Sequence, residues 1–229
     1  MTYIIPNRSL VVSCQALQGE PLHGSDTMVK MAIAAMQGGA AGIRANGIED
    51  VKAISEAVDL PVIGLLKKDY TGNDIYITPT LEDALQISKA GADIVALDAT
   101  DRMRPDGRSL SETIGILKSK GILVMADIST FEEGIKAASF GADFVSTTLS
   151  GYTPYSKALD GPDLELVTKL ANVLDVPLVA EGRISTPDEA VSALNAGAYF
   201  VVVGGAITRP QQITKKFTEK IQERQAKIL

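Results

Sequence analysis

The stretch Pro61-Val-Ile-Gly-Leu-Leu-Lys-Lys-Asp69 is apolar as far as Leu66 and then changes abruptly to two lysines. Such an uninterrupted apolar run is typical of a strand in a parallel sheet, because helices cover both faces of that sheet. Burial at the end of the strand disfavours a charged ammonium group, so Lys67 is a candidate catalytic base. The alternative is that Lys67 and Lys68 are ordinary solvated loop residues.

Seven further runs have the same character and alternate with amphipathic segments along the chain. Strands are expected over 10–14, 41–45, 61–66, 93–97, 122–126, 143–146, 177–180 and 199–203. Helices are expected over 26–38, 48–57, 81–90, 110–120, 131–140, 163–174, 187–196 and from about 210. Several helices have a capping side chain or a proline at their start. The expected openings are Ser25 or Asp26, Thr80, Ser109 or Ser111, Ser129 or Thr130, and Thr186 with Pro187.

A Gly-Ala dipeptide precedes every second expected strand, at Gly39, Gly91, Gly141 and Gly197, with spacings of 52, 50 and 56 residues. Glycine there fits the left-handed conformation that ends a helix. A period of about 50 residues is two strand–helix units, and four such periods close an eight-stranded barrel. We therefore predict an α/β protein, a single-domain (β/α)8 TIM barrel spanning residues 1–229. The alternative, a doubly wound open sheet, usually has a glycine-rich loop after its first strand, where this chain has Ser13-Cys-Gln-Ala-Leu17.

Composition narrows the functional classes. The formal net charge of −6 argues against general nucleic-acid binding, which needs a basic face. The chain has no apolar run near the roughly 20 residues that span a bilayer, and its first residues lack the pattern of a signal peptide. A soluble, cytoplasmic protein is therefore expected. With one cysteine, Cys14, and one histidine, His23, a single chain can form neither an intrachain disulfide nor a Cys/His zinc site.

Polar side chains follow the expected strands, and in a TIM barrel the C-terminal ends of the strands carry the active site. Each residue taken alone has a simpler explanation as a cap or a surface charge, but the set favours a functional rim. Its members are Gln15, Arg44, Asn46, Lys67, Asp98, Asp127, Thr147, Thr148, Glu181, Arg183, Thr208 and Arg209.

The last two loops predict a phosphate site. Gly182 follows the seventh expected strand, and Gly204 and Gly205 follow the eighth. Glycine lets the backbone approach a ligand closely, and these two loops commonly bind phosphate in this fold. Tight turns are the alternative explanation, although two adjacent glycines are hard to explain by turning alone. Arg183 is grouped with this site, with its side chain facing either the phosphate or the solvent.

Lys67 and Glu181 are expected on the same side of the sheet. Lys67 lies six residues after Pro61 and Glu181 four residues after Pro177, so both offsets are even. A lysine beside a carboxylate is a plausible proton-transfer pair. The rival explanation is that Asp98, Asp127 and Glu181 bind Mg²⁺. The metal-dependent pentose-phosphate 3-epimerases of this fold resemble this chain in architecture but rely on histidine ligands. The sole His23 lies in a loop after the first expected strand, so we predict no metal.

Blocks at nearly every strand end resemble the N-acetylmannosamine-6-phosphate 2-epimerase family. The blocks are Val12-Ser-Cys-Gln-Ala-Leu17, Gly42-Ile-Arg-Ala-Asn46, Gly64-Leu-Leu-Lys-Lys-Asp-Tyr70, Ala96-Leu-Asp-Ala-Thr100, Met125-Ala-Asp-Ile-Ser129, Thr147-Thr-Leu-Ser-Gly-Tyr-Thr153, Ala180-Glu-Gly-Arg183 and Val202-Val-Gly-Gly-Ala-Ile-Thr-Arg209. The resemblance covers essentially the whole chain, and the blocks recur in order.

The resemblance implies interconversion of N-acetyl-D-mannosamine 6-phosphate and N-acetyl-D-glucosamine 6-phosphate in bacterial sialic acid use. No nicotinamide, flavin or metal cofactor is expected, because this reaction involves no net oxidation. The resemblance also implies that Lys67 handles the C2 proton with help from Glu181. By the same resemblance Gln15, Arg44, Asp127 and Arg209 bind the sugar, and Gly182, Gly204 and Gly205 surround the phosphate. It also favours a homodimer, in which the last helix packs either on its own barrel or on the second subunit.

Two other functions fit parts of this pattern. A Schiff-base aldolase also uses a lysine at a strand end and a phosphorylated sugar. A non-catalytic sugar-phosphate sensor needs the phosphate loops and arginines but has no need for Lys67 and Glu181.

Overall fold

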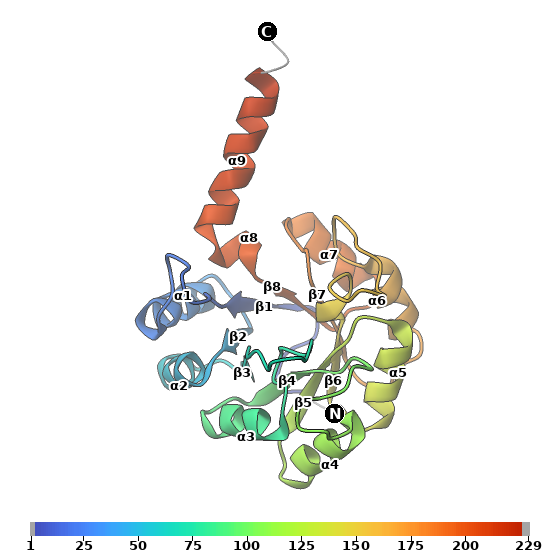
Figure 1. The fold of residues 1–229 in the computed structure, drawn as a ribbon. Helices are drawn as coiled ribbons and strands as arrows, with labels where there is room; N and C mark the ends of the chain where they lie inside the picture. Colours follow the sequence, from blue (N-terminus) through green and yellow to red (C-terminus); the bar gives the residue numbers. More distant parts are fainter. Residues whose placement is uncertain (1–2, 226–229) are drawn as a thin grey trace.

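The computed structural model describes residues 3–225, and within them eight parallel strands close into a barrel in sequence order (Figure 1). Closure is direct, because β1 pairs with both β2 and β8, for example through Val11 and Val202. The (β/α)8 prediction is confirmed, and the open sheet is excluded. The strands are β1 Ser9–Cys14, β2 Gly42–Asn46, β3 Val62–Leu65, β4 Ile94–Asp98, β5 Leu123–Asp127, β6 Phe144–Ser146, β7 Leu178–Glu181 and β8 Phe200–Val203. Residues 1, 2 and 226–229 of the predicted domain lie outside the described part.

Helices follow the strands and surround the barrel (Figure 1). They are α1 Ser25–Gln37, α2 Ile48–Ala57, α3 Leu81–Lys89, α4 Leu110–Ser119, α5 Phe131–Ser139, α6 Leu164–Ala171, α7 Pro187–Asn195, α8 Gly205–Thr208 and α9 Pro210–Gln225, with a 3-10 helix η1 at Thr147–Leu149. The short helices η1 and α8 were not predicted. Within residues 3–225, no helix is both long and apolar enough to cross a bilayer.

Capping side chains explain where most helices begin. Thr80, Ser109, Thr130 and Thr186 each form a capping box with the acidic residue three positions later. The start of α1 differs from the prediction. Gly24 is its N-cap and Ser25 is already helical, because the Ser25 hydroxyl donates to Asp50 of α2 instead.

The end of α6 also differs from the prediction. This helix stops at Ala171 rather than at residue 174. The chain tightens into a turn there, in which the amides of Val173 and Leu174 both donate to the carbonyl of Leu170.

The core has two layers. Side chains such as Ile63, Leu65, Val179 and Phe200 fill the barrel interior, whereas their sequence neighbours pack between the strands and the helices. This alternation carries Lys67 and Glu181 to the inner side, two residues beyond Leu65 and Val179 respectively. Lys67 and Glu181 therefore lie on the same side of the sheet, as their even offsets predicted.

The last helix, α9, is the exception to the compact barrel. It begins beside α8 and projects away from the other elements (Figure 1). Phe217 and Ile221 on it are 68% and 58% exposed. A helix that is not covered by its own barrel leaves these side chains available to another molecule.

Candidate active site

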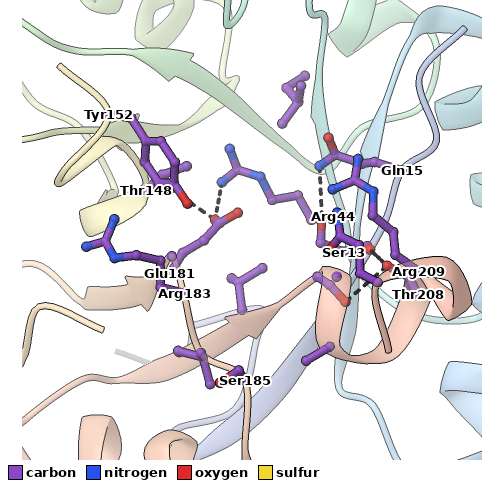
Figure 2. Close-up of a pocket in the computed structure, with 18 of the residues that line it drawn as sticks. Ser13, Gln15, Arg44, Thr148, Tyr152, Glu181, Arg183, Ser185, Thr208 and Arg209 are labelled. Carbon is purple, nitrogen blue, oxygen red and sulfur yellow. Dashed lines mark hydrogen bonds and ion pairs between the residues drawn. The ribbon is translucent and has the colours of Figure 1, made fainter. Parts of the chain in front are cut away.

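A polar cavity of about 370 Å³ opens at the carboxyl ends of the strands, where (β/α)8 enzymes carry their active sites. Most of the predicted site residues line it. They are Gln15, Arg44, Lys67, Glu181, Gly182, Arg183, Gly204, Gly205 and Arg209. Figure 2 shows Gln15 and Arg209 across the cavity from Glu181 and Arg183.

Arg44 and Asp127 form a buried ion pair behind this cavity. The Arg44 guanidinium donates to both oxygens of Asp127, with Nη1–Oδ1 at 3.1 Å and Nη2–Oδ2 at 2.5 Å. Asp127 is fully buried and is not on the cavity wall. Its carboxylate is held by Arg44, so sugar binding by Asp127 stays a prediction.

Glu181 forms an ion pair with the same arginine. Arg44 Nη1 lies 2.7 Å from Glu181 Oε2, and Thr148 Oγ1 lies 3.1 Å from that oxygen. Burial, together with the negative charge of Asp127, raises the pKa of Glu181 to about 7, against the opposing effect of Arg44. A carboxyl group with this pKa exchanges protons readily at neutral pH.

Lys67 follows β3, where its amide donates to Asn46 Oδ1 at 2.7 Å and its backbone forms a bridge with Ile77. Burial, together with the nearby positive charges of Arg44 and Arg209, lowers the pKa of Lys67 to about 8. The alternative of a solvated loop lysine does not hold for Lys67. Lys68 fits the description of a solvated loop lysine better, because its side chain is 49% exposed and pairs with Asp83.

Gln15 lines the cavity and has an unused acceptor. Its amide Nε2 donates to Ser13 Oγ at 2.9 Å, while Oε1 is buried without a partner among residues 3–225. A buried amide oxygen without a donor costs free energy. Gln15 is therefore well suited to accept a hydrogen bond from a bound hydroxyl or amide.

The loops after β7 and β8 form the other end of the cavity. Gly182 has a φ of +110°, a conformation that other residues rarely adopt. A Cβ on Gly205 would lie 2.4 Å from Gln212 Oε1. These loops and the short helix α8 that follows are the common phosphate site of (β/α)8 barrels. Arg209 lies beside them, paired with Glu20 at 3.2 Å.

Arg183 lines the cavity, and its side chain is bound to the loop after β6. Its Nε donates to the carbonyl of Gly161 and its Nη1 to the carbonyl of Ser150, at 2.9 and 2.6 Å. Its guanidinium also stacks on the ring of Tyr152 and points away from Arg209 (Figure 2). The side chain is partly buried and holds the loop after β6.

The three carboxylates of the magnesium alternative are not brought together. Asp98 is buried and pairs with Arg102 at 2.6 Å and with Thr100 at 2.7 Å. In the part of the chain from residue 3 to 225, no group of three His, Cys, Asp or Glu side chains is arranged to hold a metal ion.

Several lining residues were not predicted as part of the site, among them Tyr76, Tyr152, Ser185, Gln212 and Lys216. Tyr76 and Tyr152 come from long loops, and Lys216 from α9, so no strand-end pattern marks them. Thr148 also lines the cavity, and its position after β6 had placed it in the predicted rim.

The fold and this cavity define a (β/α)8-barrel enzyme with a small-molecule site at the C-terminal face of the barrel. Residues 28–223 match the family described as "Putative N-acetylmannosamine-6-phosphate epimerase". The chain belongs to this family.

Relatives with the name "Putative N-acetylmannosamine-6-phosphate 2-epimerase" match nearly the full chain. One from Caldanaerobacter subterraneus subsp. tengcongensis is 58% identical over 217 residues, covering 94% of this chain and 92% of the relative. One from Clostridium perfringens is 54% identical over 211 residues, covering 92% and 96%.

Solved structures agree with these matches. The N-acetylmannosamine-6-phosphate 2-epimerase from Clostridium perfringens superposes with a TM-score of 0.92 at 52% identity, over 94% of each chain. A thiamine phosphate pyrophosphorylase from Pyrococcus furiosus, with a TM-score of 0.59 at 21% identity over 88% of this chain and 87% of its own, shares the fold alone.

Proposed function

We propose that this enzyme interconverts N-acetyl-D-mannosamine 6-phosphate and N-acetyl-D-glucosamine 6-phosphate by epimerisation at C2, as part of sialic acid and amino sugar breakdown. The observation that carries the proposal is the pair Lys67 and Glu181, which face one cavity with pKa values of about 8 and 7. Two groups that titrate near neutrality are what proton transfer at C2 requires. Family membership supplies the identity of the sugar.

The reaction follows from the chemistry of the substrate. The C2–H bond becomes acidic only in the open-chain form, where C1 is an aldehyde. Glu181 moves a proton between the C1 hydroxyl and the ring oxygen to open the ring. Lys67 removes the proton at C2 to give an enolate, and a proton returned to the opposite face inverts the carbon.

The barrel supports access to both faces of C2. Lys67 follows β3 and Glu181 ends β7, and these strands are four apart in a closed ring of eight. The two groups therefore approach a bound sugar from opposite walls. Arg44, between Asp127 and Glu181, holds positive charge where the enolate oxygen develops.

The remaining lining residues bind the substrate in this proposal. Gln15 accepts from a sugar hydroxyl or amide, and Arg209 contributes positive charge. Backbone amides of Gly182, Gly204 and Gly205 hold the phosphate, which is consistent with the loops that they occupy. A phosphorylated substrate suits an enzyme of the cytoplasm, which is where we place it.

Proton NMR of N-acetylmannosamine 6-phosphate in D₂O tests the function. We expect conversion to the gluco epimer with deuterium at C2, lost in Lys67→Ala and unaffected by EDTA. Lys68→Ala is the matched control, because Lys68 is the neighbouring lysine and pairs with Asp83. The activity of the Lys68→Ala variant should stay near that of wild type. Conversion that survives in Lys67→Ala would move the base elsewhere.

The same measurement separates the alternatives. A sensor incorporates no deuterium. A Schiff-base aldolase forms an imine at Lys67, so borohydride with substrate would label the protein covalently. We expect no such label from the epimerase.

A homodimer through α9 is part of the proposal. Ile213, Phe217 and Ile221 recur at a spacing of four residues on this helix, so they form one apolar stripe. The helix projects from the barrel domain (Figure 1), and a second copy of the chain is a partner that would cover this stripe.

A further inference from the structure

Thr148 connects the two carboxylates of the site. Its Oγ1 lies 2.7 Å from Asp127 Oδ1 and 3.1 Å from Glu181 Oε2. It also lies 2.8 Å from the hydroxyl of Ser146, which is buried. Thr148 belongs to η1, directly after β6, so the barrel brings it between β5 and β7.

The donor in the Ser146 contact follows from hydrogen counting. A threonine hydroxyl has one hydrogen, and an ionised carboxylate can only accept. The hydrogen of Thr148 must therefore point to Asp127 or Glu181. Ser146 then donates to Thr148, so the oxygen of Thr148 is already an acceptor and its hydrogen is left for the carboxylates.

The contacts also distinguish the two oxygens of Glu181. Arg44 and Thr148 are both directed at Oε2 (Figure 2). Within residues 3–225, Oε1 accepts no hydrogen bond from the protein, and Glu181 lines the cavity. Oε2 is thus the oxygen held by the protein, and Oε1 is the oxygen free to exchange a proton with a bound sugar.

We propose that Thr148 is a positioning residue for Glu181, and that its hydroxyl hydrogen moves from Glu181 Oε2 to Asp127 Oδ1 each time Glu181 takes up a proton. With Glu181 ionised, the hydroxyl stabilises the charge. With Glu181 protonated, the hydroxyl turns to Asp127, which remains ionised beside Arg44. In both states the Thr148 hydroxyl has an ionised acceptor and Glu181 Oε2 keeps Arg44 as its partner, so the carboxyl group keeps its orientation through the reaction. No covalent bond of Thr148 changes.

The groups that face Glu181 define the expected pH effect. They are Arg44 from β2, Lys67 after β3, Asp127 from β5 and Thr148 itself. The hydroxyl lowers the pKa of Glu181, as Arg44 and Lys67 do, while burial and Asp127 raise it. Removal of the hydroxyl therefore raises the pKa of Glu181 further above its ordinary value.

The test compares Thr148→Val, which keeps the shape, with Thr148→Ser, which keeps the hydroxyl. The role rests on the proposed epimerase, so two readouts are needed. In epimerisation assays, we expect kcat of the Val variant at pH 6.5 to fall roughly tenfold or more with little change in KM. The acidic limb of its pH profile should move to higher pH, and the Ser variant should restore both. Thr113→Val, at a buried threonine in α4 far from the site, is the control and should change neither.

Carbon-13 NMR of glutamate-labelled protein gives the second readout, without substrate. The Glu181 carboxyl signal, assigned by its loss in Glu181→Gln, should titrate at higher pH in Thr148→Val than in wild type or Thr148→Ser. If the Val variant is poorly folded, Thr148→Ala replaces it. An unchanged titration would overturn the role of Thr148 even if the enzyme is active. A wild type that converts no sugar would overturn the proposed function, while the titration would still decide the role of Thr148.

Discussion

Arg44 controls the charge of the pocket at the scale of single residues. It is 1% exposed and lies against two carboxylates, Asp127 and Glu181. Burial alone would lower the pKa of Arg44, but these two negative charges outweigh it and raise the pKa. One guanidinium thus compensates the charges of two carboxylates incompletely, and Glu181 therefore tends to hold a proton.

The pKa values of Lys67 and Glu181 predict a bell-shaped dependence of kcat/KM on pH. One group must be protonated and the other unprotonated for a proton to leave one face of C2 and return to the other. Glu181 loses its proton as pH rises through about 7, and Lys67 loses its proton as pH rises through about 8. The fraction with one shared proton is largest between these values and falls on both sides.

Initial rates of epimerisation between pH 5.5 and 9.5, an interval of about 1.5 pH units beyond each limb, check this prediction. Lys67→Arg is the companion variant and should be inactive throughout, because an arginine stays protonated in this range. A rate that rises steadily over the whole interval would contradict the assignment of the pair.

At the scale of elements, the tight packing of β3 against the helices predicts that a larger residue at Gly64 destabilises the protein. Gly64 points outward from the strand, and a Cβ on it would lie 2.7 Å from both Ala92 Cβ and Ile87 Cγ2. Real Cβ atoms do not approach that closely, so the backbone or the helix α3 must shift. We expect Gly64→Ala to lower the free energy of unfolding by about 1–3 kcal/mol, measured by urea denaturation.

Gly115→Ala is the matched control for this substitution. Gly115 lies inside α4, and a Cβ there would meet nothing within 4 Å. Alanine in an exposed helix interior is more favourable than glycine by roughly 0.5–1 kcal/mol, so this variant should be more stable than wild type. Equal stability of the two variants would contradict the tight fit of Gly64.

Secondary structure was predictable because each element carries its own local signals. Every strand boundary agrees with the expected one within a residue, since apolar runs flanked by caps and glycines mark them directly. The short helices η1 and α8 escaped prediction because a helix of three or four residues has no periodic pattern.

At the scale of the whole molecule, the projecting helix α9 predicts that the protein forms a dimer. If a second copy covers the apolar stripe of α9, then Phe217→Glu with Ile221→Glu places charges in the interface. We expect wild type to sediment as a dimer and the double variant to have a dissociation constant at least roughly 100-fold higher. Sedimentation velocity over a concentration series measures this.

Ile135→Glu on α5 is the control, because it adds a charge at a partly exposed apolar residue on a different part of the barrel (Figure 1). It should leave the association unchanged. A wild type that remains monomeric at every concentration would remove α9 as a dimer contact.

The sequence by itself determined the barrel and the side chains at its C-terminal rim. Successive side chains of a strand point to opposite faces, which is a local property of the backbone. The even offsets of Lys67 from Pro61 and of Glu181 from Pro177 were therefore enough to predict that both lie on the same side. The tertiary structure decided what those side chains do to one another. Arg44 meets Asp127 across 83 residues of chain, and Thr148 meets Glu181 across 33. Such contacts arise only when the barrel closes, because distance through space, and not separation along the chain, sets which charges interact.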